Sequence, residues 1–254
     1  MSDKTATRVV GVIPARWGST RLPGKSLVPL CGKPLVQWVA ERAAAAAALD
    51  AVLVATDDER IRDAVCGFGG TAVMTRPDHA SGTDRVAEAV AALDAEIVIN
   101  IQGDMPLIDP DLIDRLAQAM RNTDNWDMAT AAVPLRDENL LRASSVVKVV
   151  CAQDGRALYF SRAAIPFVRD PGSVSCDGLY AWHLGIYAYR RAFLERLVNT
   201  APCALERAES LEQLRALFLG GRILVLPADG PVAHVDVPED VATAEAAIRA
   251  AGLA

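Results

Sequence analysis

Patterns that bind metals or carry redox chemistry are scarce in this sequence. It has three histidines, and its five cysteines (Cys31, Cys66, Cys151, Cys176 and Cys203) form no C-x-x-C pair. Neither a zinc knuckle nor a dithiol redox site is therefore indicated, and a metal site built from histidines is disfavoured. Positive charge is not in excess either, because 26 Lys and Arg stand against 32 Asp and Glu, for a net charge of −6. This balance disfavours a protein that binds nucleic acid through a broad basic surface. An anionic substrate must instead be held by a local cationic cluster.

Long apolar runs are also missing. No apolar stretch reaches the roughly 18 residues that a membrane-spanning helix requires. The first residues, MSDKTATR, show no charged-then-apolar pattern of a signal peptide. An odd number of scattered cysteines is typical of reduced, buried thiols. Together these features predict a cytoplasmic protein that does not contact a membrane.

What the first hundred residues do contain is a regular alternation of short apolar runs and amphipathic segments. Buried strands are predicted at residues 8–14, 51–56 and 96–101, and helices at 33–48, 58–66 and 82–93. This β-α-β-α order is typical of a parallel sheet with helices on both faces. The length of 254 residues suits one large α/β domain or two small ones.

The middle of the chain is richer in strands. Strands are predicted at 128–135, 146–151, 156–160, 184–189 and 222–226, a loop at 173–180, and helices at 191–197, 205–219 and 238–251. Asp154-Gly155 is a typical two-residue hairpin turn. We therefore expect one α/β domain over residues 1–254, with a β-rich insertion at about 126–190.

The segment Ala15–Lys25, ARWGSTRLPGK, is the most informative loop. It follows a buried strand, and ligands bind at the carboxyl ends of strands in parallel sheets. Its cations Arg16, Arg21 and Lys25, with glycines that allow close backbone approach, are suited to a polyphosphate. It matches neither the Walker pattern nor the dinucleotide pattern. The alternative is a solvated basic loop.

Three further positions have a functional and a structural interpretation. Asp104 follows a predicted strand and a glycine, which suits a Mg²⁺ ligand. Asp236 is either a second ligand or the N-cap of the last helix. Ser81-Gly82-Thr83 opens a predicted helix, so it is at least a cap, and His79 alone is typical of a surface loop.

The string PARWGSTRLPGK followed by GKPLVQWV resembles the signature of the 3-deoxy-manno-octulosonate cytidylyltransferases, the CMP-KDO synthetases. The resemblance continues in order through VATDDERI, MTRPDHASGTDR, INIQGDMPLI, ALYFSRAAIP, HLGIYAYR, LERAESLEQLR and VDVPEDV. It covers nearly the whole chain. It implies a Rossmann-like, mostly parallel sheet of the nucleotide-diphospho-sugar transferase type. It also implies a CTP-dependent enzyme that transfers CMP to the hydroxyl of 3-deoxy-manno-octulosonate (KDO) or a related acid and releases pyrophosphate.

The resemblance also implies roles for individual residues. Mg²⁺ would be the cofactor, with Asp104 and Asp236 as its ligands. The residues implied to act in catalysis are Arg16, Arg21, Lys25 and Asp104. The nucleotide would be bound by Ala15, Arg16, Ser19, Arg21, Lys25, Thr75, Arg76, Ser81, Gly82 and Gln102. The acid would be bound by Gln102, Arg162, His183, Tyr187, Glu212 and Gln213. The β-rich insertion, with Val168–Tyr180, would form a homodimer contact.

The sequence departs from the family pattern in three places. Met105 stands where a glutamate is usual, Trp182 where an arginine is usual, and Ser144-Ser145 where asparagines are usual. The segment from Arg169 to Tyr180 is shorter than usual. The acceptor half therefore departs more than the CTP half. Three alternatives remain open: a cytidylyltransferase for another small acid, such as a phosphonate or a different sugar acid, a non-catalytic nucleotide-binding homologue, and a sugar-1-phosphate nucleotidylyltransferase.

Overall fold

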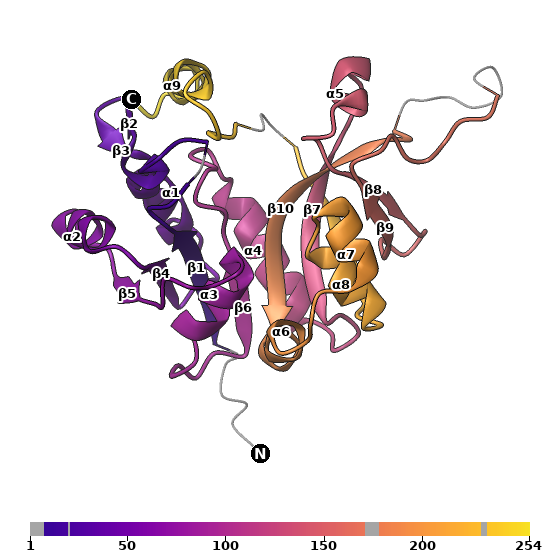
Figure 1. Ribbon diagram of the computed structural model, residues 1–254, viewed down its shortest axis with the longest axis horizontal. Helices are drawn as coiled ribbons and strands as arrows, with labels where there is room; N and C mark the ends of the chain where they lie inside the picture. Colours follow the sequence, from indigo (N-terminus) through magenta and orange to yellow (C-terminus); the bar gives the residue numbers. More distant parts are fainter. Residues whose placement is uncertain (1–7, 20, 171–177, 230–232) are drawn as a thin grey trace. The chain divides into compact units, whose positions relative to one another are not determined.

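The computed structural model describes residues 8–19, 21–170, 178–229 and 233–254. The chain divides into two compact units, and Figure 1 labels their helices and strands. Unit 1 comprises residues 1–121 and 231–254, and unit 2 comprises residues 122–230. The segment at about 126–190, expected as an insertion, falls in unit 2. Its predicted role as an insertion and dimer contact stays a prediction, and residues 171–177 of it lie outside the described part.

Unit 1 contains a parallel sheet with the strand order β6-β1-β4-β5. The strands are β1 (Val9–Ala15), β4 (Ala51–Thr56), β5 (Ala72–Met74) and β6 (Ile97–Asn100). Most side chains of β1 and β6 are buried, as expected for apolar runs covered on both faces. The parallel α/β core predicted from the alternation of the first hundred residues is confirmed.

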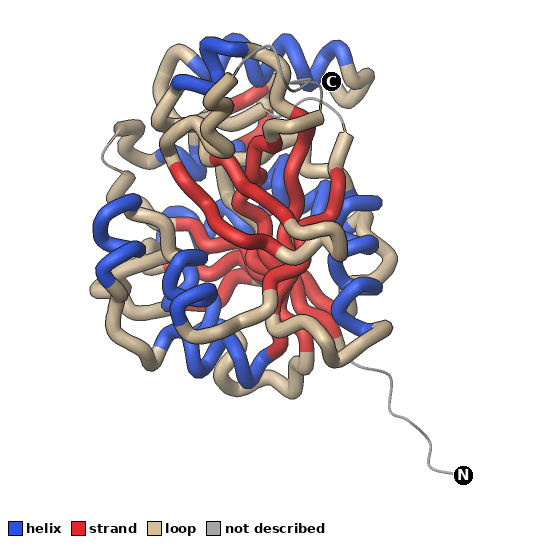
Figure 2. Tube along the Cα trace, turned by 90° about the vertical axis from the view of Figure 1, so that its right-hand side faces the viewer, coloured by secondary structure: helices blue, strands red, loops and turns tan. Residues whose placement is uncertain are grey.

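Helices connect and flank these strands. They are α1 (Leu35–Ala44), α2 (Glu59–Gly67), α3 (Gly82–Ala89), α4 (Pro110–Arg121) and α9 (Asp240–Ala250). A 3₁₀ turn η1 (Lys25–Leu27) and the short strands β2 (Pro29–Leu30) and β3 (Lys33–Pro34) precede α1. Helices α1 and α4 pack against each other, whereas α3 contacts β1 and β4. Figure 2 distinguishes the strands, in red, from the helices, in blue.

Unit 2 is built mainly on antiparallel pairing. Its elements are β7 (Met128–Pro134), α5 (Glu138–Arg142), β8 (Lys148–Cys151), β9 (Ala157–Ser161), β10 (Ala181–Arg190), α6 (Arg191–Val198), α7 (Ala204–Glu209), α8 (Gln213–Phe218) and β11 (Ile223–Pro227). Strand β10 pairs antiparallel with β7 and β8, and β8 pairs antiparallel with β9. Strand β11 pairs parallel with β7. Gly155, at φ 80°, supplies the left-handed residue of the turn between β8 and β9.

Several predicted boundaries need correction. The helix expected at 205–219 is two short helices, α7 and α8, because Ser210 adopts a left-handed conformation with φ 51° that ends α7. The helix expected from Lys33 begins only at Leu35, since Lys33 and Pro34 form β3. Helices α4 and α5 were not predicted at all.

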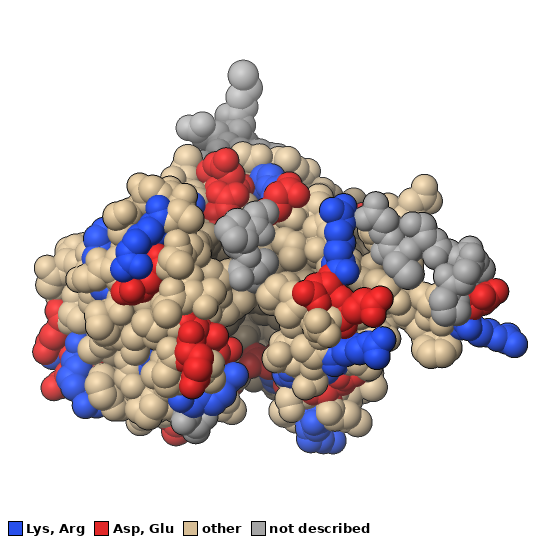
Figure 3. All heavy atoms as spheres, turned by 90° about the horizontal axis from the view of Figure 1, so that it is seen from above, with Lys and Arg blue, Asp and Glu red and all other residues tan. Residues whose placement is uncertain are grey.

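The described residues contain no helix that is long and apolar enough to cross a membrane. Acidic and basic side chains are interspersed over the face drawn in Figure 3.

Candidate nucleotide-binding site

The parallel sheet of unit 1 brings the ends of its strands to one edge. Ala15 pairs with Thr56, and Thr56 pairs with Met74, so the last residues of β1, β4 and β5 form one row. The predicted nucleotide residues follow directly: Arg16 after β1, Thr75 after β5, and Gln102 two residues after β6. Sequence segments that are far apart therefore meet at the edge where parallel sheets bind ligands.

The loop after β1 is folded back on itself around Trp17. The Trp17 carbonyl accepts hydrogen bonds from the backbone N–H of Ser19 at 2.8 Å and of Gly24 at 3.2 Å. Gly24 has φ 69°, and a Cβ there would lie 3.0 Å from the Trp17 ring, so only glycine fits without strain. The guanidinium carbon of Arg60, on α2, lies 3.3 Å from the centre of the Trp17 ring. These contacts give the loop a defined shape.

Lys25, at the end of this loop, contacts both aspartates predicted as metal ligands. Its Nζ lies 3.0 Å from Oδ2 of Asp104 and 3.0 Å from Oδ1 of Asp236. One cationic group, the Lys25 ammonium, therefore contacts a carboxylate oxygen of each aspartate. Arg21 lies 3.3 Å from the same Asp236 oxygen, with 64% of its side chain exposed. Arg16 is exposed, and Ser19 is half-buried.

Asp104 carries a stable negative charge at this place. Burial by itself would raise its pKa, but His234 and Lys25 together lower the pKa well below its usual range. The Oδ1 atom lies 3.7 Å from Nδ1 of His234 and is buried without a hydrogen-bond partner among the described residues. This oxygen can accept a further hydrogen bond or bind a cation.

Asp236 does not cap the last helix. Helix α9 begins at Asp240, and it is the Asp240 carboxylate that accepts hydrogen bonds from the backbone N–H of Asp236 at 2.7 Å and of Val237 at 3.0 Å. The structural alternative for Asp236 is therefore wrong, and its side chain points toward Lys25 and Arg21.

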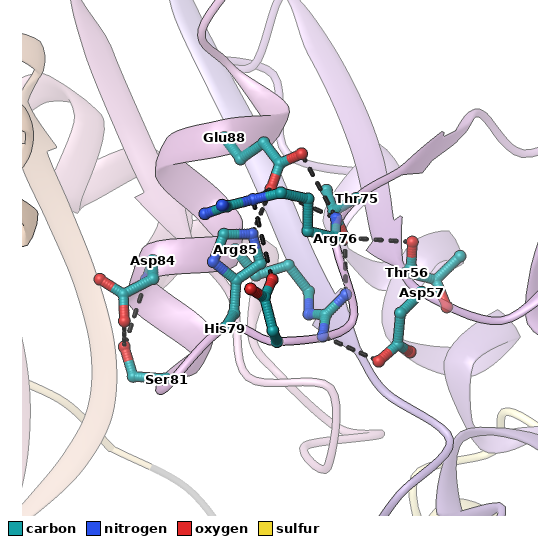
Figure 4. Close-up of polar contacts among 10 residues, drawn as sticks. Thr56, Asp57, Thr75, Arg76, His79, Ser81, Asp84, Arg85 and Glu88 are labelled. Carbon is teal, nitrogen blue, oxygen red and sulfur yellow. Dashed lines mark hydrogen bonds and ion pairs between the residues drawn. The ribbon is translucent and has the colours of Figure 1, made fainter.

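The segment after β5 is held by helix α3 (Figure 4). The Thr75 hydroxyl donates to the Thr56 carbonyl at 3.1 Å. Ser81 is the N-cap of α3, as expected, since its Oγ accepts from the Asp84 backbone at 3.2 Å. Gly82 is the first residue of α3 and is exposed, and the Arg76 guanidinium lies 3.6 Å from Glu88. His79 lies in a loop and is half-buried as a residue, but its side chain is only 5% exposed and contacts Glu88.

Arg162, in unit 2, already has several partners. Its guanidinium donates to the backbone carbonyls of Glu209 at 2.7 Å, Ser144 at 2.8 Å and Ser210 at 3.3 Å. Its backbone carbonyl accepts from Lys148 Nζ at 2.5 Å. Three of its five N–H groups are thus engaged, which leaves two for the predicted acid.

The remaining acceptor residues of unit 2 lie in and beside an aromatic group. His183 is buried, and its Nε2 lies 3.0 Å from the Thr130 hydroxyl. Burial lowers the pKa of His183 to about 3, so it is neutral near pH 7. The ring of Tyr187 lies 5.3 Å from that of His183. Burial, Tyr189 and the charge of Glu212 raise the pKa of Tyr187 well above its usual value.

Glu212 and Gln213 open α8 rather than lying inside one long helix. Gln213 is buried and Glu212 is half-buried. The structural alternative for Glu212, a solvated helix face shared with Arg215, is wrong, because Arg215 is itself buried and pairs with Glu206 at 3.0 Å. Gln102, in unit 1, is half-buried.

The three departures from the family pattern have different surroundings. Met105 is only 5% exposed, so an apolar side chain is packed one residue after Asp104. Trp182 is half-buried on β10. Ser144 and Ser145 are exposed, and the Ser144 carbonyl accepts a hydrogen bond from a predicted site residue, Arg162.

Several residues of these networks were missed by sequence reasoning. Each of four such residues contacts a predicted site residue: Arg85 and His234 in unit 1, and Lys148 and Glu209 in unit 2. The signal for Arg85 was present, since it closes the string HASGTDR. A charged residue in the otherwise apolar run VVKVVC could likewise have identified Lys148.

The residues at the edge fit a magnesium ion. Among the described residues no cluster of three or more His, Cys, Asp or Glu is placed to hold a metal. The two carboxylates at this edge that contact Lys25 are those of Asp104 and Asp236. Mg²⁺ is commonly held by one or two carboxylates, with water and substrate phosphates completing its shell. The buried, unbonded Oδ1 of Asp104 is an oxygen ligand of the required kind.

The chain is similar to known cytidylyltransferases. The family model described as "Cytidylyltransferase" matches residues 10–223, most of the chain. A cytidylyltransferase from Leptospira borgpetersenii has a similar fold, with a TM-score of 0.66 at 19% identity over 96% of this chain and 87% of that one. The class defined by fold and site is thus a cytidylyltransferase.

Relatives at higher identity narrow the class. The 3-deoxy-manno-octulosonate cytidylyltransferase of Pelobacter propionicus is 45% identical over 95% of this chain and 98% of its own. That of Pseudomonas fluorescens is 50% identical over 91% and 94%. A solved CMP:2-keto-3-deoxy-manno-octonic acid synthetase, complexed with CTP, has a TM-score of 0.89 at 42% identity, covering 96% of this chain and 100% of that one. The chain belongs to the 3-deoxy-manno-octulosonate cytidylyltransferase family.

Proposed function

We propose that this chain transfers CMP from CTP to the hydroxyl group of KDO and releases pyrophosphate. The observation that carries the proposal is the contact of Lys25 with both Asp104 and Asp236, at the carboxyl edge of the parallel sheet and beside the loop after β1. The similarity to relatives named for this reaction, over more than nine-tenths of the chain, supports it.

The chemistry is an in-line substitution at the α-phosphorus of CTP. The acceptor oxygen forms a bond to that phosphorus while the bond to the β-phosphate bridging oxygen breaks, and the acceptor proton is lost. Arg16, Arg21 and Lys25 neutralise the triphosphate and the negative charge that accumulates on the leaving pyrophosphate. Lys25 acts as a compact charge, and the exposed Arg21 guanidinium supplies a planar pair of donors. The loop around Trp17 orients these groups before the substrate arrives.

Magnesium is the cofactor that this site would hold, with Asp104 and Asp236 as protein ligands. When bound, it polarises the phosphate and lowers the pKa of the acceptor hydroxyl. Burial by itself would raise the pKa of Asp104, but its neighbours His234 and Lys25 lower the pKa and keep that carboxylate ionised. It can therefore act as a ligand without first losing a proton.

The nucleotide residues and the acid residues have separate tasks. The nucleotide is assigned to Ala15, Ser19, Thr75, Arg76, Ser81 and Gly82. Gln102 is assigned to both substrates. Arg162, His183, Tyr187, Glu212 and Gln213 bind the acid. Three N–H groups of Arg162 donate to backbone carbonyls and hold its guanidinium, and we assign its two remaining N–H groups to the acid. A homodimer formed through the β-rich segment of unit 2, and a cytoplasmic location, complete the proposal.

A second acceptor is favoured by one observation. The buried Met105 and the half-buried Trp182 replace charged residues usual in the family. Loss of an anion near the metal and of a cation near the acceptor changes the charge that the acid meets. A related ulosonic acid, another sugar acid or a phosphonate is therefore the alternative acceptor.

Pyrophosphate release separates the acceptors. The purified chain is incubated with CTP, MgCl₂ and each member of a panel: KDO, other ulosonic acids, simpler sugar acids and phosphonates. Release with KDO supports the proposal, and parallel reactions with UTP or without MgCl₂ measure base and metal dependence. Release with another acid but not with KDO contradicts it in favour of the second acceptor. No release with any acid, while CTP still binds, supports a non-catalytic homologue.

A further inference from the structure

Arg85 is a buried cation that the proposed reaction does not use. It lies on α3 and is only 3% exposed. Its guanidinium donates to Oγ1 of Thr75 at 2.6 Å through one terminal nitrogen and to Oδ2 of Asp57 at 3.0 Å through the other (Figure 4). These partners follow β5 and β4 respectively. One side chain thus joins the carboxyl ends of two neighbouring strands to a helix.

The contact with Arg85 completes the hydrogen bonding of Thr75. The Thr75 hydroxyl donates its single hydrogen to the Thr56 carbonyl at 3.1 Å, so it can only accept from Arg85. The backbone N–H of Thr75 also donates to the Thr56 carbonyl, at 2.8 Å. With its hydroxyl held from two sides and its backbone tied to β4, Thr75 has a single orientation. The same contacts fix the direction of the backbone from Thr75 to Arg76.

Asp57 depends on Arg85 for its position. Its Oδ1 atom is buried and has no hydrogen-bond partner among the described residues, whereas Oδ2 accepts from Arg85. A buried carboxylate without a cation is costly, so the pair is kept together by the charge of each member. Loss of the guanidinium would leave Asp57 without this partner and free to reorient toward solvent.

Helix α3 also contacts the segment after Thr75 through a second residue. Glu88, three residues after Arg85, accepts from the backbone N–H of Arg76 at 3.3 Å and contacts His79. Residues three apart lie on one face of a helix, so the contacts of Arg85 and Glu88 come from the same face of α3. The first turn of this helix carries Ser81 and Gly82, which we propose bind the nucleotide. The two parts of the nucleotide site are therefore connected through α3.

We propose that Arg85 is a positioning residue for CTP binding, which holds Thr75, Asp57 and the start of α3 in one arrangement without touching the reacting atoms. This inference rests on the proposed function, because it assigns the segment 75–82 to the nucleotide. Lysine cannot replace this arginine, since one ammonium group lacks the planar fork that reaches two partners at once. A residue that merely stabilised the fold would affect every substrate alike.

The test compares two buried arginines. Arg215, in unit 2, is 5% exposed, pairs with Glu206 at 3.0 Å and donates to backbone carbonyls. The dissociation constant for CTP is measured by calorimetry without acid, for the wild-type chain, Arg85→Lys and Arg215→Lys, below their melting temperatures. Arg85→Lys is expected to weaken CTP binding about tenfold or more, the effect of losing one charge-assisted hydrogen bond. Arg215→Lys is expected to lower the melting temperature with CTP binding within about twofold of wild type.

Two further measurements test the role of Arg85. Asp57→Asn, which retains the shape of the side chain, tests the same contact if Arg85→Lys does not fold, and it too is expected to weaken CTP binding. At saturating CTP, Arg85→Lys is expected to regain a kcat close to that of the wild type, with its defect confined to the KM for CTP. Unchanged CTP binding in Arg85→Lys, or an equal loss in Arg215→Lys, overturns the inference alone. A wild-type chain that binds no CTP overturns the proposed function as well.

Discussion

The ammonium group of Lys25 lies 3.0 Å from a carboxylate oxygen of Asp104, although 79 residues separate them in the sequence. The parallel sheet causes this proximity, because Lys25 belongs to the loop after β1 and Asp104 to the loop after its neighbour β6. Asp236 reaches the same ammonium group from the segment before α9. The sheet thus gathers one ammonium group and two carboxylates from three distant segments of the chain.

Asp104→Asn is expected to reduce pyrophosphate release at least about a hundredfold while the chain stays folded. The reason is that the substitution removes a carboxylate that we propose as a ligand of the metal ion. Release with CTP and KDO measures the effect, and circular dichroism checks the fold. The control is Asp50→Asn, because Asp50 accepts from the Val9 backbone at 2.7 Å, at the opposite edge of the same sheet. Activity in Asp104→Asn close to that of the control would remove the metal assignment.

Lys25→Met is expected to bind Mn²⁺ more tightly in the absence of CTP, by about tenfold. The substitution removes a positive charge that lies 3.0 Å from each carboxylate and competes with a metal for them. The same variant is expected to bind CTP more weakly. Electron paramagnetic resonance of free Mn²⁺ and calorimetry with CTP measure the two affinities.

Lys33→Met provides the comparison for Lys25→Met. Lys33 forms an exposed ion pair with Glu41 at 2.7 Å on α1, so its loss is expected to leave both affinities unchanged. If Lys25→Met bound Mn²⁺ no more tightly than Lys33→Met, Lys25 would not be competing with the metal.

Stability is expected to fall with acid as a result of His183. Its pKa is lowered by burial to about 3 in the folded chain, against 6.5 for an ordinary histidine. Between these values the unfolded chain binds the extra proton, so the contribution is fully present above pH 6.5 and is lost as the pH falls toward 3. From pH 6.5 to pH 5 the expected loss is roughly 1–2 kcal/mol.

Urea unfolding at several pH values measures this contribution. A His183→Gln variant removes the titrating ring, so its free energy of unfolding should depend less on pH across the same interval. Equal pH dependence in the variant and the wild type would show that His183 does not carry the effect.

Lys148→Met is expected to lower the free energy of unfolding by at least about 2 kcal/mol, because buried carbonyl groups lose their donor. Lys148 is fully buried, and its Nζ donates to the carbonyls of Ala143 at 3.1 Å, Val146 at 2.6 Å and Arg162 at 2.5 Å. Chemical denaturation measures the loss. The exposed Lys33→Met is expected to change stability by no more than about 1 kcal/mol. Equal losses of unfolding free energy in Lys148→Met and Lys33→Met would show that the hydrogen bonds from Lys148 to the carbonyl groups do not stabilise the fold.

Local patterns predicted the core elements well. The strand at Ala51–Thr56 was predicted to the residue, because a short β-branched run flanked by polar residues has a single interpretation. The helix over 205–219 was wrong because its apolar spacing continues through Ser210, where the backbone changes to φ 51°. Periodicity reports which face is buried and is insensitive to one residue with an unusual dihedral angle.

The α/β class, the cationic loop after the first strand and, through the ordered motifs, the family could all be predicted from the amino-acid sequence. Those features depend on near neighbours in the chain. The folded arrangement was needed to show that Asp236 faces Lys25 instead of capping a helix, and that Arg85 joins two strand ends. Such contacts connect segments far apart in the sequence, and which polar groups meet is decided when the strand ends are brought to one edge of the sheet.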